Sequence, residues 1–274
     1  MLLDGERLKS KILDNLKKEI KSNRLNVKLA IIMIGDNDAS KIYVKNKINS
    51  CKEIGIEVDE YLLDEKVTNT EVANLIDKLN ANRSVTGIIL QSPIPKHLNY
   101  NRLCSRIDGS KDVDGFTKNN IYNLYLNEKT IMPCTVRGII YLLKDYNIKL
   151  CGSHCVIVGR GNIVGKPLIH ALLNEDATVT IAHSKTKNLS ELTKNADIVI
   201  SATGIPHLIT ADMIKDKAVV VDVGVSRVDG KIVGDVDFDT VAKKAAFITP
   251  NPHGVGPMTV AMIMANLVDM AKER

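Results

Sequence analysis

A glycine-rich segment after a short apolar run constrains the fold of this chain more than any other feature. Residues 156–158 are Val-Ile-Val, the next nine residues contain three glycines, and residues 168–173 have the apolar pattern of a helix. The order of strand, glycine turn and helix is that of the first unit of a Rossmann sheet. There the glycines let the backbone approach a pyrophosphate, and the helix N-terminus presents unpaired N–H groups to it. The segment therefore predicts a parallel sheet with an anion site.

The glycines occur as Gly159-x-Gly161-x-x-x-Gly165, which is one residue longer than the usual dinucleotide fingerprint and moderately specific by itself. About 20 residues after this segment, an NAD enzyme usually carries an acidic residue that binds the ribose hydroxyls. Here the predicted strand over 178–182 is followed by His183 and Ser184, without a carboxylate.

Basic and hydroxyl side chains at the same two loops favour a phosphate on that ribose. Arg160, His183, Ser184 and Lys185 would supply charge and donors to a 2′-phosphate. The segment thus indicates NADP rather than NAD. A basic solvated loop is the alternative, because lysine is common throughout the chain.

The chain alternates strand and helix patterns on both sides of a connection near residues 146–154. The expected strands cover residues 29–34, 57–63 and 86–90 in the first half, and 156–158, 179–182, 197–201, 219–223 and 247–249 in the second. The alternation predicts an α/β fold of two domains with parallel sheets. Loops at 202–204, 224–226 and 250–252 follow strands of the second half, where parallel sheets bind ligands.

Composition excludes several classes of protein. The five cysteines lack the spacing of a zinc or redox site, and no apolar run would span a bilayer. The opening residues lack the pattern of a signal peptide, so we expect a cytoplasmic protein. A net charge of +5 without tryptophan is too mild for nucleic acid, although it favours small anions. We therefore expect neither a nucleic-acid nor a membrane partner, and no metal.

Two residues on a predicted helix after the first strand are candidates for chemistry. Tyr43 and Lys47 are four residues apart and therefore share one helical face. Because Lys41, Lys45 and Lys52 lie in the same segment, a solvated lysine is the plain alternative. The Tyr-x-x-x-Lys spacing also occurs in short-chain dehydrogenases, but there it follows the nucleotide loop, whereas here it precedes it by more than a hundred residues.

Polar residues at later loops are ambiguous by themselves. Gln91 ends a predicted strand and is compatible with a surface hydrogen bond. Asp112 and Asp114 could form a turn or bind a hard cation, although the further oxygen ligands of a calcium loop are missing. A single carboxylate could also accept two parallel hydrogen bonds from a heterocycle. Residue chemistry alone thus indicates a two-domain, NADP-dependent enzyme.

Taken together, these residues resemble the bifunctional methylenetetrahydrofolate dehydrogenase/methenyltetrahydrofolate cyclohydrolase family over nearly the whole chain. The matching segments are Ser40-x-x-Tyr43-Val44-x-x-Lys47, Leu90-Gln91-x-Pro93-Ile94-Pro95, Lys111-Asp112-Val113-Asp114-Gly115, Pro133-Cys134-Thr135, Gly159-Arg160-x-x-x-Val164-Gly165-x-Pro167, Asp222-Val223-Gly224, Gly234-Asp235-Val236 and Gly254-Val255-Gly256-Pro257-Met258-Thr259.

The resemblance implies an N-terminal αβα catalytic domain over 1–137 and a Rossmann-like NADP-binding domain over 138–255, with a last helix over 256–274 that packs back on the first. It also implies oxidation of 5,10-methylenetetrahydrofolate with NADP⁺, then hydrolysis to 10-formyltetrahydrofolate, in one-carbon metabolism and purine biosynthesis. A homodimer formed through the Rossmann half is expected. The alternatives are an enzyme with one of the two activities and a non-catalytic NADP-binding regulatory protein.

By the same resemblance, Lys47 is the central acid and base, a role open to lysine where burial and neighbours lower its pKa. Gln91 would hold its ammonium group, Tyr43 would stack on the folate, and Asp114 would bind the pterin edge. The remaining expected substrate contacts are Pro252 and Gly254. The expected cofactor residues are Gly159, Arg160, Gly161, Val164, Gly165, His183, Ser184, Thr203, Gly204 and Val225.

The chain departs from the family pattern at four places. Gly161 replaces a common serine and removes a hydroxyl from the phosphate site, and His253 lies where the Pro-Val-Pro-Gly-Gly pattern has glycine. Val136 and Asn49 replace a proline and a basic residue. His253 adds bulk and a titratable ring near the expected folate pocket.

Overall fold

The computed structural model describes the backbone of all 274 residues and every side chain except those of Asp38 and Ala39. The chain divides into two compact units. The three-stranded unit contains residues 10–134 and 260–274, and the five-stranded unit contains residues 1–9 and 135–259. The chain passes from one unit to the other at 134/135 and again at 259/260. The domain boundaries predicted from the sequence, at 137/138 and 255/256, lie close to these two points and stay a prediction.

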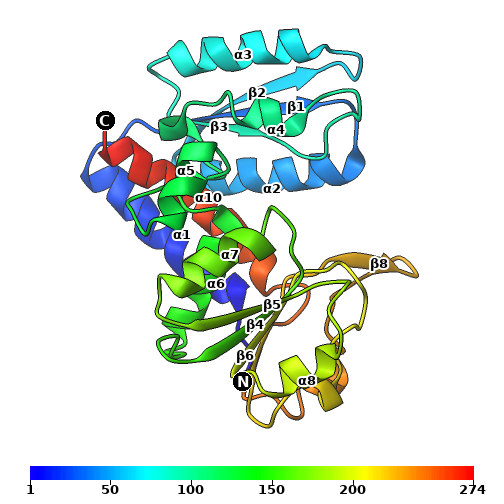
Figure 1. The fold of residues 1–274 in the computed structure, drawn as a ribbon. Helices are drawn as coiled ribbons and strands as arrows, with labels where there is room; N and C mark the ends of the chain where they lie inside the picture. Colours follow the sequence, from blue (N-terminus) through cyan, green and yellow to red (C-terminus); the bar gives the residue numbers. More distant parts are fainter. The chain divides into compact units, whose positions relative to one another are not determined.

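A parallel sheet in the order β2-β1-β3 forms the centre of the three-stranded unit. Its strands are β1 (Lys28–Ile34), β2 (Glu57–Leu63) and β3 (Gly87–Leu90). Helices α2 (Asp38–Ile54) and α3 (Asn69–Ala81) lie on opposite faces of this sheet (Figure 1). β1 is an almost uninterrupted apolar run because both of its faces are covered.

Alternate residues of β1 enter two separate packing layers. Ala30, Ile32 and Ile34 join the core cluster under α3 and α4 (Tyr100–Cys104). On the α2 side, the Cys51 thiol lies 3.5 Å from the sulfur of Met264 in helix α10 (Val255–Lys272). Residues 260–272 of this last helix thus belong to the three-stranded unit.

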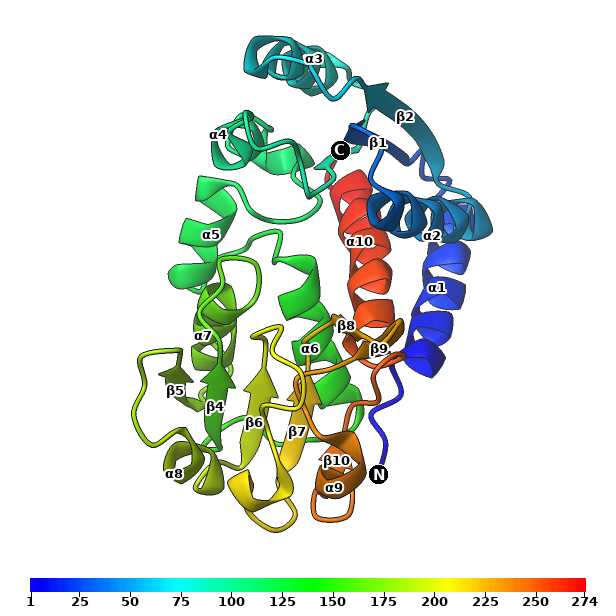
Figure 2. The same cartoon turned by 90° about the vertical axis from the view of Figure 1, so that its right-hand side faces the viewer.

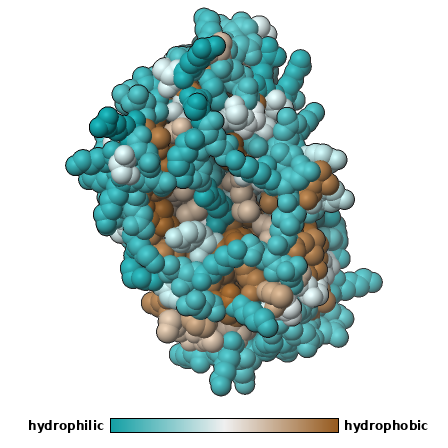
Figure 3. Space-filling model, turned by 90° about the vertical axis from the view of Figure 1, so that its left-hand side faces the viewer, coloured by the Kyte–Doolittle hydropathy of each residue, from teal (hydrophilic) through white to brown (hydrophobic). Residues whose placement is uncertain are grey.

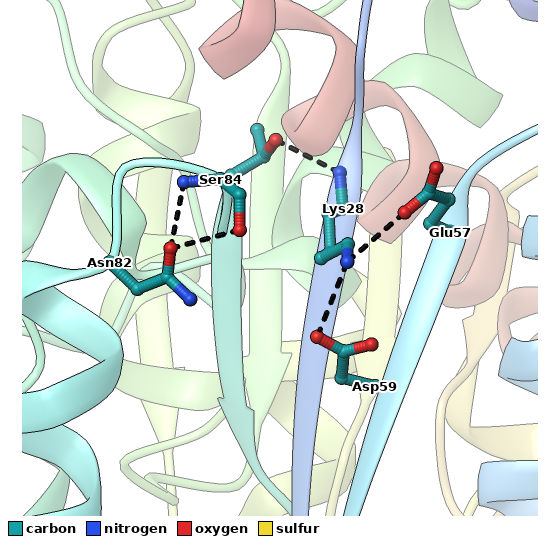
Figure 4. Close-up of polar contacts among 6 residues, drawn as sticks. Lys28, Glu57, Asp59, Asn82 and Ser84 are labelled. Carbon is teal, nitrogen blue, oxygen red and sulfur yellow. Dashed lines mark hydrogen bonds and ion pairs between the residues drawn. The ribbon is translucent and has the colours of Figure 1, made fainter.

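Polar contacts fix the register at the amino edge of the same sheet. Lys28 forms ion pairs with Glu57 at 3.1 Å and Asp59 at 3.5 Å on β2, and its backbone N–H donates to Thr86 Oγ1 (Figure 4). Both neighbouring segments are therefore aligned with the start of β1. Their carboxyl ends consequently meet at one edge.

The five-stranded unit contains a parallel sheet in the order β10-β7-β6-β4-β5 (Figure 2). Its strands are β4 (His154–Val158), β5 (Thr178–Ala182), β6 (Ile198–Ser201), β7 (Val219–Asp222) and β10 (Phe247–Ile248). Its helices and short turns are α6 (Cys134–Asp145), α7 (Gly165–Leu173), α8 (Leu189–Lys194), α9 (Phe238–Val241) and the 3-10 turn Ala211–Met213. Leu2 adds a parallel bridge to Ile248 at the sheet edge.

The predicted α/β class and parallel sheets are confirmed, with local differences at element ends. α2 begins at Asp38, because Asn37 Oδ1 accepts a hydrogen bond from Ser40 N at 3.0 Å and caps the helix. An antiparallel hairpin of β8 (Ser226–Val228) and β9 (Lys231–Val233) was not predicted from the sequence. Its turn, Asp229-Gly230, has positive φ at both residues.

Hydrophilic residues cover most of the face drawn in Figure 3, with hydrophobic areas between them. Across the described part of the chain, no helix combines the length and the apolar character needed to cross a bilayer. All five cysteines are free thiols.

Candidate active site

A hydrogen bond between Lys47 and Gln91 joins two segments of the three-stranded unit. Lys47 lies midway along α2, and its Nζ donates to Gln91 Oε1 at 2.9 Å. Gln91 directly follows β3 and is buried, and its Nε2 donates to the carbonyl of Ser92 at 2.6 Å. The glutamine is thereby fixed with its oxygen toward the lysine. Lys47 is half-buried, whereas Lys45 on the same helix is exposed.

Tyr43 lies one turn before Lys47 on the same helix and remains accessible. The residue is 52% exposed, which leaves ring surface for a ligand. An exposed aromatic ring beside a half-buried amine can bind a flat heterocycle by stacking.

Asp114 is held in place by two buried neighbours in the chain. The Nζ of Lys111 donates to the carbonyls of Leu79, Asn80 and Asn82, which end α3. Asp112 accepts hydrogen bonds from the backbone of Gly115 and Thr117 and from Asn120, while burial raises the pKa of its carboxyl. Lys111 and Asp112 thus have structural roles.

The Asp114 carboxylate itself is half-buried and accepts no hydrogen bond within the described residues. Its segment runs beside β3 through a parallel bridge between Ile88 and Asp112. Two residues beyond that bridge, Asp114 lies toward the sheet edge at which Gln91 follows β3. It is thus open to a ligand.

Lys47 and Gln91 meet near the switch point of the sheet. The chain leaves β1 toward β2 on one side and returns to β3 on the other, and open α/β sheets bind ligands at the carboxyl edge between such strands. A pocket of about 310 Å³ lies at this edge, but Tyr43, Lys47, Gln91 and Asp114 are not among the residues that line it. It is lined by Ile34, Gly35, Asp36, Asn37, Glu65, Pro93, Ile94 and Pro95.

The glycine turn of the five-stranded unit is closed by backbone contacts. Gly159 has φ +120°, and a Cβ there would lie 2.4 Å from the carbonyl oxygen of Ala202. A Cβ on Gly165 would lie 2.1 Å from the carbonyl oxygen of Gly159. Gly161 instead faces open space. Val164 precedes α7 without a side-chain cap. In the first turn, Lys166 N donates to Gly161 O at 3.0 Å and Pro167 has no N–H, so the N–H of Gly165 is the one left for a ligand within the described residues.

The loop after β5 places a histidine beside this turn. Gly159 N donates to Ala182 O at 2.8 Å, which joins the two strand ends. His183 Nδ1 accepts from the Lys185 backbone N–H at 3.1 Å, so the proton of the neutral ring lies on Nε2. Arg160 and Ser184 are exposed nearby in the chain.

Thr203, Gly204 and Val225 lie at the carboxyl edge of the same sheet. Thr203 is half-buried, and both its backbone N–H and its hydroxyl donate to Asp235 Oδ2. Ser226 donates to the carbonyl of Gly204 at 2.9 Å, and Val225 is 54% exposed. Asp235 has no role that could be predicted from the sequence, because its partners are distant in the chain.

The loop at 250–254 is held by backbone contacts with the chain start. The carbonyl of His253 accepts from the N–H groups of Gly5 and Glu6. Gly254 is buried, and a Cβ there would lie 2.5 Å from the carbonyl oxygen of Pro250. Pro252 and the side chain of His253 are exposed. Within the described residues, no group of three potential metal ligands is present.

A Rossmann-like sheet with a glycine turn and a separate α/β unit with an amine at its switch point define a dinucleotide-dependent α/β enzyme. Comparison with known families specifies the class further. The model of the tetrahydrofolate dehydrogenase/cyclohydrolase catalytic domain matches residues 3–114, and that of its NAD(P)-binding domain matches residues 133–274. The chain belongs to the tetrahydrofolate dehydrogenase/cyclohydrolase family.

Individual relatives agree over the full length. The bifunctional protein FolD of Clostridium novyi is 49% identical over 274 residues, covering 98% of this chain and 99% of that protein. The crystal structure of FolD from Campylobacter jejuni matches with a TM-score of 0.98 and 47% identity, covering 100% and 99% of the two chains. FolD of Trypanosoma brucei, solved with NADP and an inhibitor, matches with a TM-score of 0.95 and 33% identity, covering 100% and 97%.

Proposed function

We propose that this enzyme oxidises 5,10-methylenetetrahydrofolate with NADP⁺ and hydrolyses the methenyl product to 10-formyltetrahydrofolate. Membership of the dehydrogenase/cyclohydrolase family supports both activities. The observation that carries the proposal for this chain is the hydrogen bond from Lys47 to Gln91 at the switch point. NADP binding alone would need neither residue.

The residues of the glycine turn fit NADP. Gly159 and Gly165 leave no room for a side chain between strand end and helix, while the surface at Gly161 is open. When bound, NADP⁺ supplies the hydride acceptor. The backbone N–H of Gly165, at the start of α7, would donate to the pyrophosphate. The expected cofactor contacts are Gly159, Arg160, Gly161, Val164, Gly165, His183, Ser184, Thr203, Gly204 and Val225.

For hydrolysis, Lys47 is the proposed proton carrier. The oxygen of a water molecule bonds to the methenyl carbon while the Lys47 amine takes a proton from that water. The hydroxyl on this carbon then loses its proton to solvent as the C=O bond forms, the bond from the carbon to N5 breaks, N5 receives the proton held by Lys47, and the carbon remains on N10 as a formyl group. The overall reaction consumes one water and releases one proton. Gln91 keeps the amine directed at the substrate.

Further side chains would position the folate. The exposed ring of Tyr43 would stack on it, and the unpaired carboxylate of Asp114 would accept two parallel hydrogen bonds from the pterin. Pro252 and Gly254 are proposed to contact the substrate through the loop after β10. These roles also give Tyr43, Lys47, Gln91 and Asp114 the chemistry that a regulatory NADP-binding protein would lack.

Two separate assays test the function. Methylenetetrahydrofolate with NADP⁺ should give methenyl absorbance, and added methenyltetrahydrofolate should lose that absorbance without nucleotide. The proposal would be rejected if the first assay formed neither NADPH nor methenyl absorbance and if, in the second assay, the absorbance decayed no faster than in buffer. One activity without the other would favour the monofunctional alternative.

The setting of the reaction is also proposed. Free cysteines are typical of a reducing compartment, which supports a cytoplasmic location. Exposed apolar residues on the β8–β9 hairpin, Val228 and Ile232, support a homodimer formed through the five-stranded unit. The product 10-formyltetrahydrofolate would serve one-carbon transfer in purine biosynthesis. Sedimentation would measure the oligomeric state.

A further inference from the structure

The carboxyl group of Asp235 is completely buried in the five-stranded unit and binds one short stretch of chain. Its Oδ2 accepts hydrogen bonds from Ser201 Oγ at 2.8 Å, Thr203 N at 2.6 Å and Thr203 Oγ1 at 2.8 Å. Ser201 ends β6, and Thr203 lies in the loop that follows. A single carboxyl oxygen thus holds the end of a strand and the loop at 202–204 together.

A second buried carboxyl group fixes the backbone of Asp235. Asp222, the last residue of β7, accepts from Asp235 N at 3.0 Å and from Val236 N at 3.1 Å. A Cβ on Gly234 would lie 1.8 Å from Asp222 Oδ2, so this segment packs tightly on the aspartate. The position of the Asp235 side chain is therefore determined by β7 as well as by β6.

The other oxygen of Asp235 is not used for hydrogen bonding. Oδ1 is buried and accepts no hydrogen bond within the described residues, and a Cβ on Gly224 would lie 1.9 Å from it. A buried oxygen without a donor is unfavourable for stability. The arrangement is therefore explained better by what Oδ2 holds than by a gain in stability.

The loop that Asp235 holds lies directly against the glycine turn. Ala202 N donates to Val158 O at 2.8 Å, and its own carbonyl oxygen approaches Gly159 so closely that no side chain fits there. A shift of residues 202–204 would therefore displace the turn that carries the proposed pyrophosphate contacts.

We propose that Asp235 is a positioning residue for NADP, which fixes Thr203 and thereby the loop at 202–204 in the shape that receives the cofactor. The inference rests on the proposed function of the five-stranded unit. Asp235 acts through Thr203 and does not itself touch the cofactor. The competing explanation is a residue that contributes to folding alone.

Two substitutions separate these explanations. Asp235→Ala removes the acceptor for three donors, and we expect it to weaken NADP⁺ binding by about tenfold or more in titration calorimetry. Hydrogen exchange over residues 198–206 should rise, while hydrolysis of methenyltetrahydrofolate without nucleotide should be unchanged. Asp235→Asn keeps an oxygen acceptor in the same place and should retain most of the affinity.

Matched variants complete the test. Val241→Ala removes buried volume from the apolar core of the same unit at a position in α9, outside residues 198–206, and should lower the melting temperature while NADP⁺ binding stays normal. If Asp235→Ala does not fold, Ser201→Ala removes one of the three donors and should weaken binding by about threefold. A wild-type protein that fails to bind NADP⁺ would reject the proposed function. If the wild type binds NADP⁺ and a folded Asp235→Ala or Ser201→Ala variant binds it with equal affinity, this inference is overturned.

Discussion

The Nζ of Lys47 lies 2.9 Å from Gln91 Oε1, so a helix that follows β1 and the residue that follows β3 present one polar pair at a single sheet edge. Neither residue is distinctive in sequence. Their contact depends on the order β2-β1-β3, which brings the ends of the first and third strands together.

Lys47→Ala should abolish hydrolysis of methenyltetrahydrofolate, with a loss of at least about a hundredfold, because no other positioned group would carry the proton. NADP⁺ affinity should be unchanged, since the cofactor contacts proposed here all belong to the five-stranded unit. Stopped-flow absorbance measures the first quantity and calorimetry the second. Lys45→Ala, on an exposed face of the same helix, is the control and should hydrolyse normally. Hydrolysis by Lys47→Ala at the rate of this control would reject the assigned role.

Gly161→Ser should strengthen NADP⁺ binding by about threefold to tenfold, the effect of one added hydrogen bond. A Cβ at this position meets no atom within 4 Å, so the hydroxyl can be added without displacing the turn. Affinity for NAD⁺ serves as the internal control and should not change, because NAD⁺ lacks the 2′-phosphate. An equal gain for both nucleotides would show that residue 161 does not contact this phosphate.

The sequence was sufficient for features that depend on neighbours in the chain. The strand, glycine turn and helix around Gly159 follow from local pattern, as does the common face of Tyr43 and Lys47. Asp235 could not be assigned in this way, because Ser201 and Thr203 are more than 30 residues away and only the fold joins them. The structural role of Lys111 could not be predicted either, because it depends on contacts with carbonyl groups at the end of α3. The Asp229-Gly230 turn was a local signal of the hairpin that the sequence analysis did not use.

His253→Gly should stabilise the protein by about 0.5–1 kcal/mol, because His253 has φ +86°, a region that glycine enters without steric cost. Its carbonyl would still accept from Gly5 and Glu6. Urea unfolding measures the change. His207→Gly is the matched control, since its φ of +54° lies inside the ordinary left-handed region and the gain there should be smaller. If His253→Gly is less stable than the wild type, a contact of the imidazole stabilises the protein by more than the backbone conformation at residue 253 costs.

Asp222 should make the stability of the enzyme depend on pH. Burial, together with the nearby charge of Asp235, raises the pKa of its carboxyl from 3.8 to about 6, against the opposing effect of three backbone hydrogen bonds. A group whose pKa is higher in the folded state contributes most at low pH, and this contribution is lost as the pH rises through 6. Asp222→Asn cannot titrate there, so the stability of the wild type relative to this variant should fall by about 2 kcal/mol between about pH 4 and pH 8. Urea unfolding of both proteins at the two pH values measures the difference. If the relative stability is constant over this range, the Asp222 carboxyl has the same pKa in the folded protein as in the unfolded chain, and the prediction is wrong.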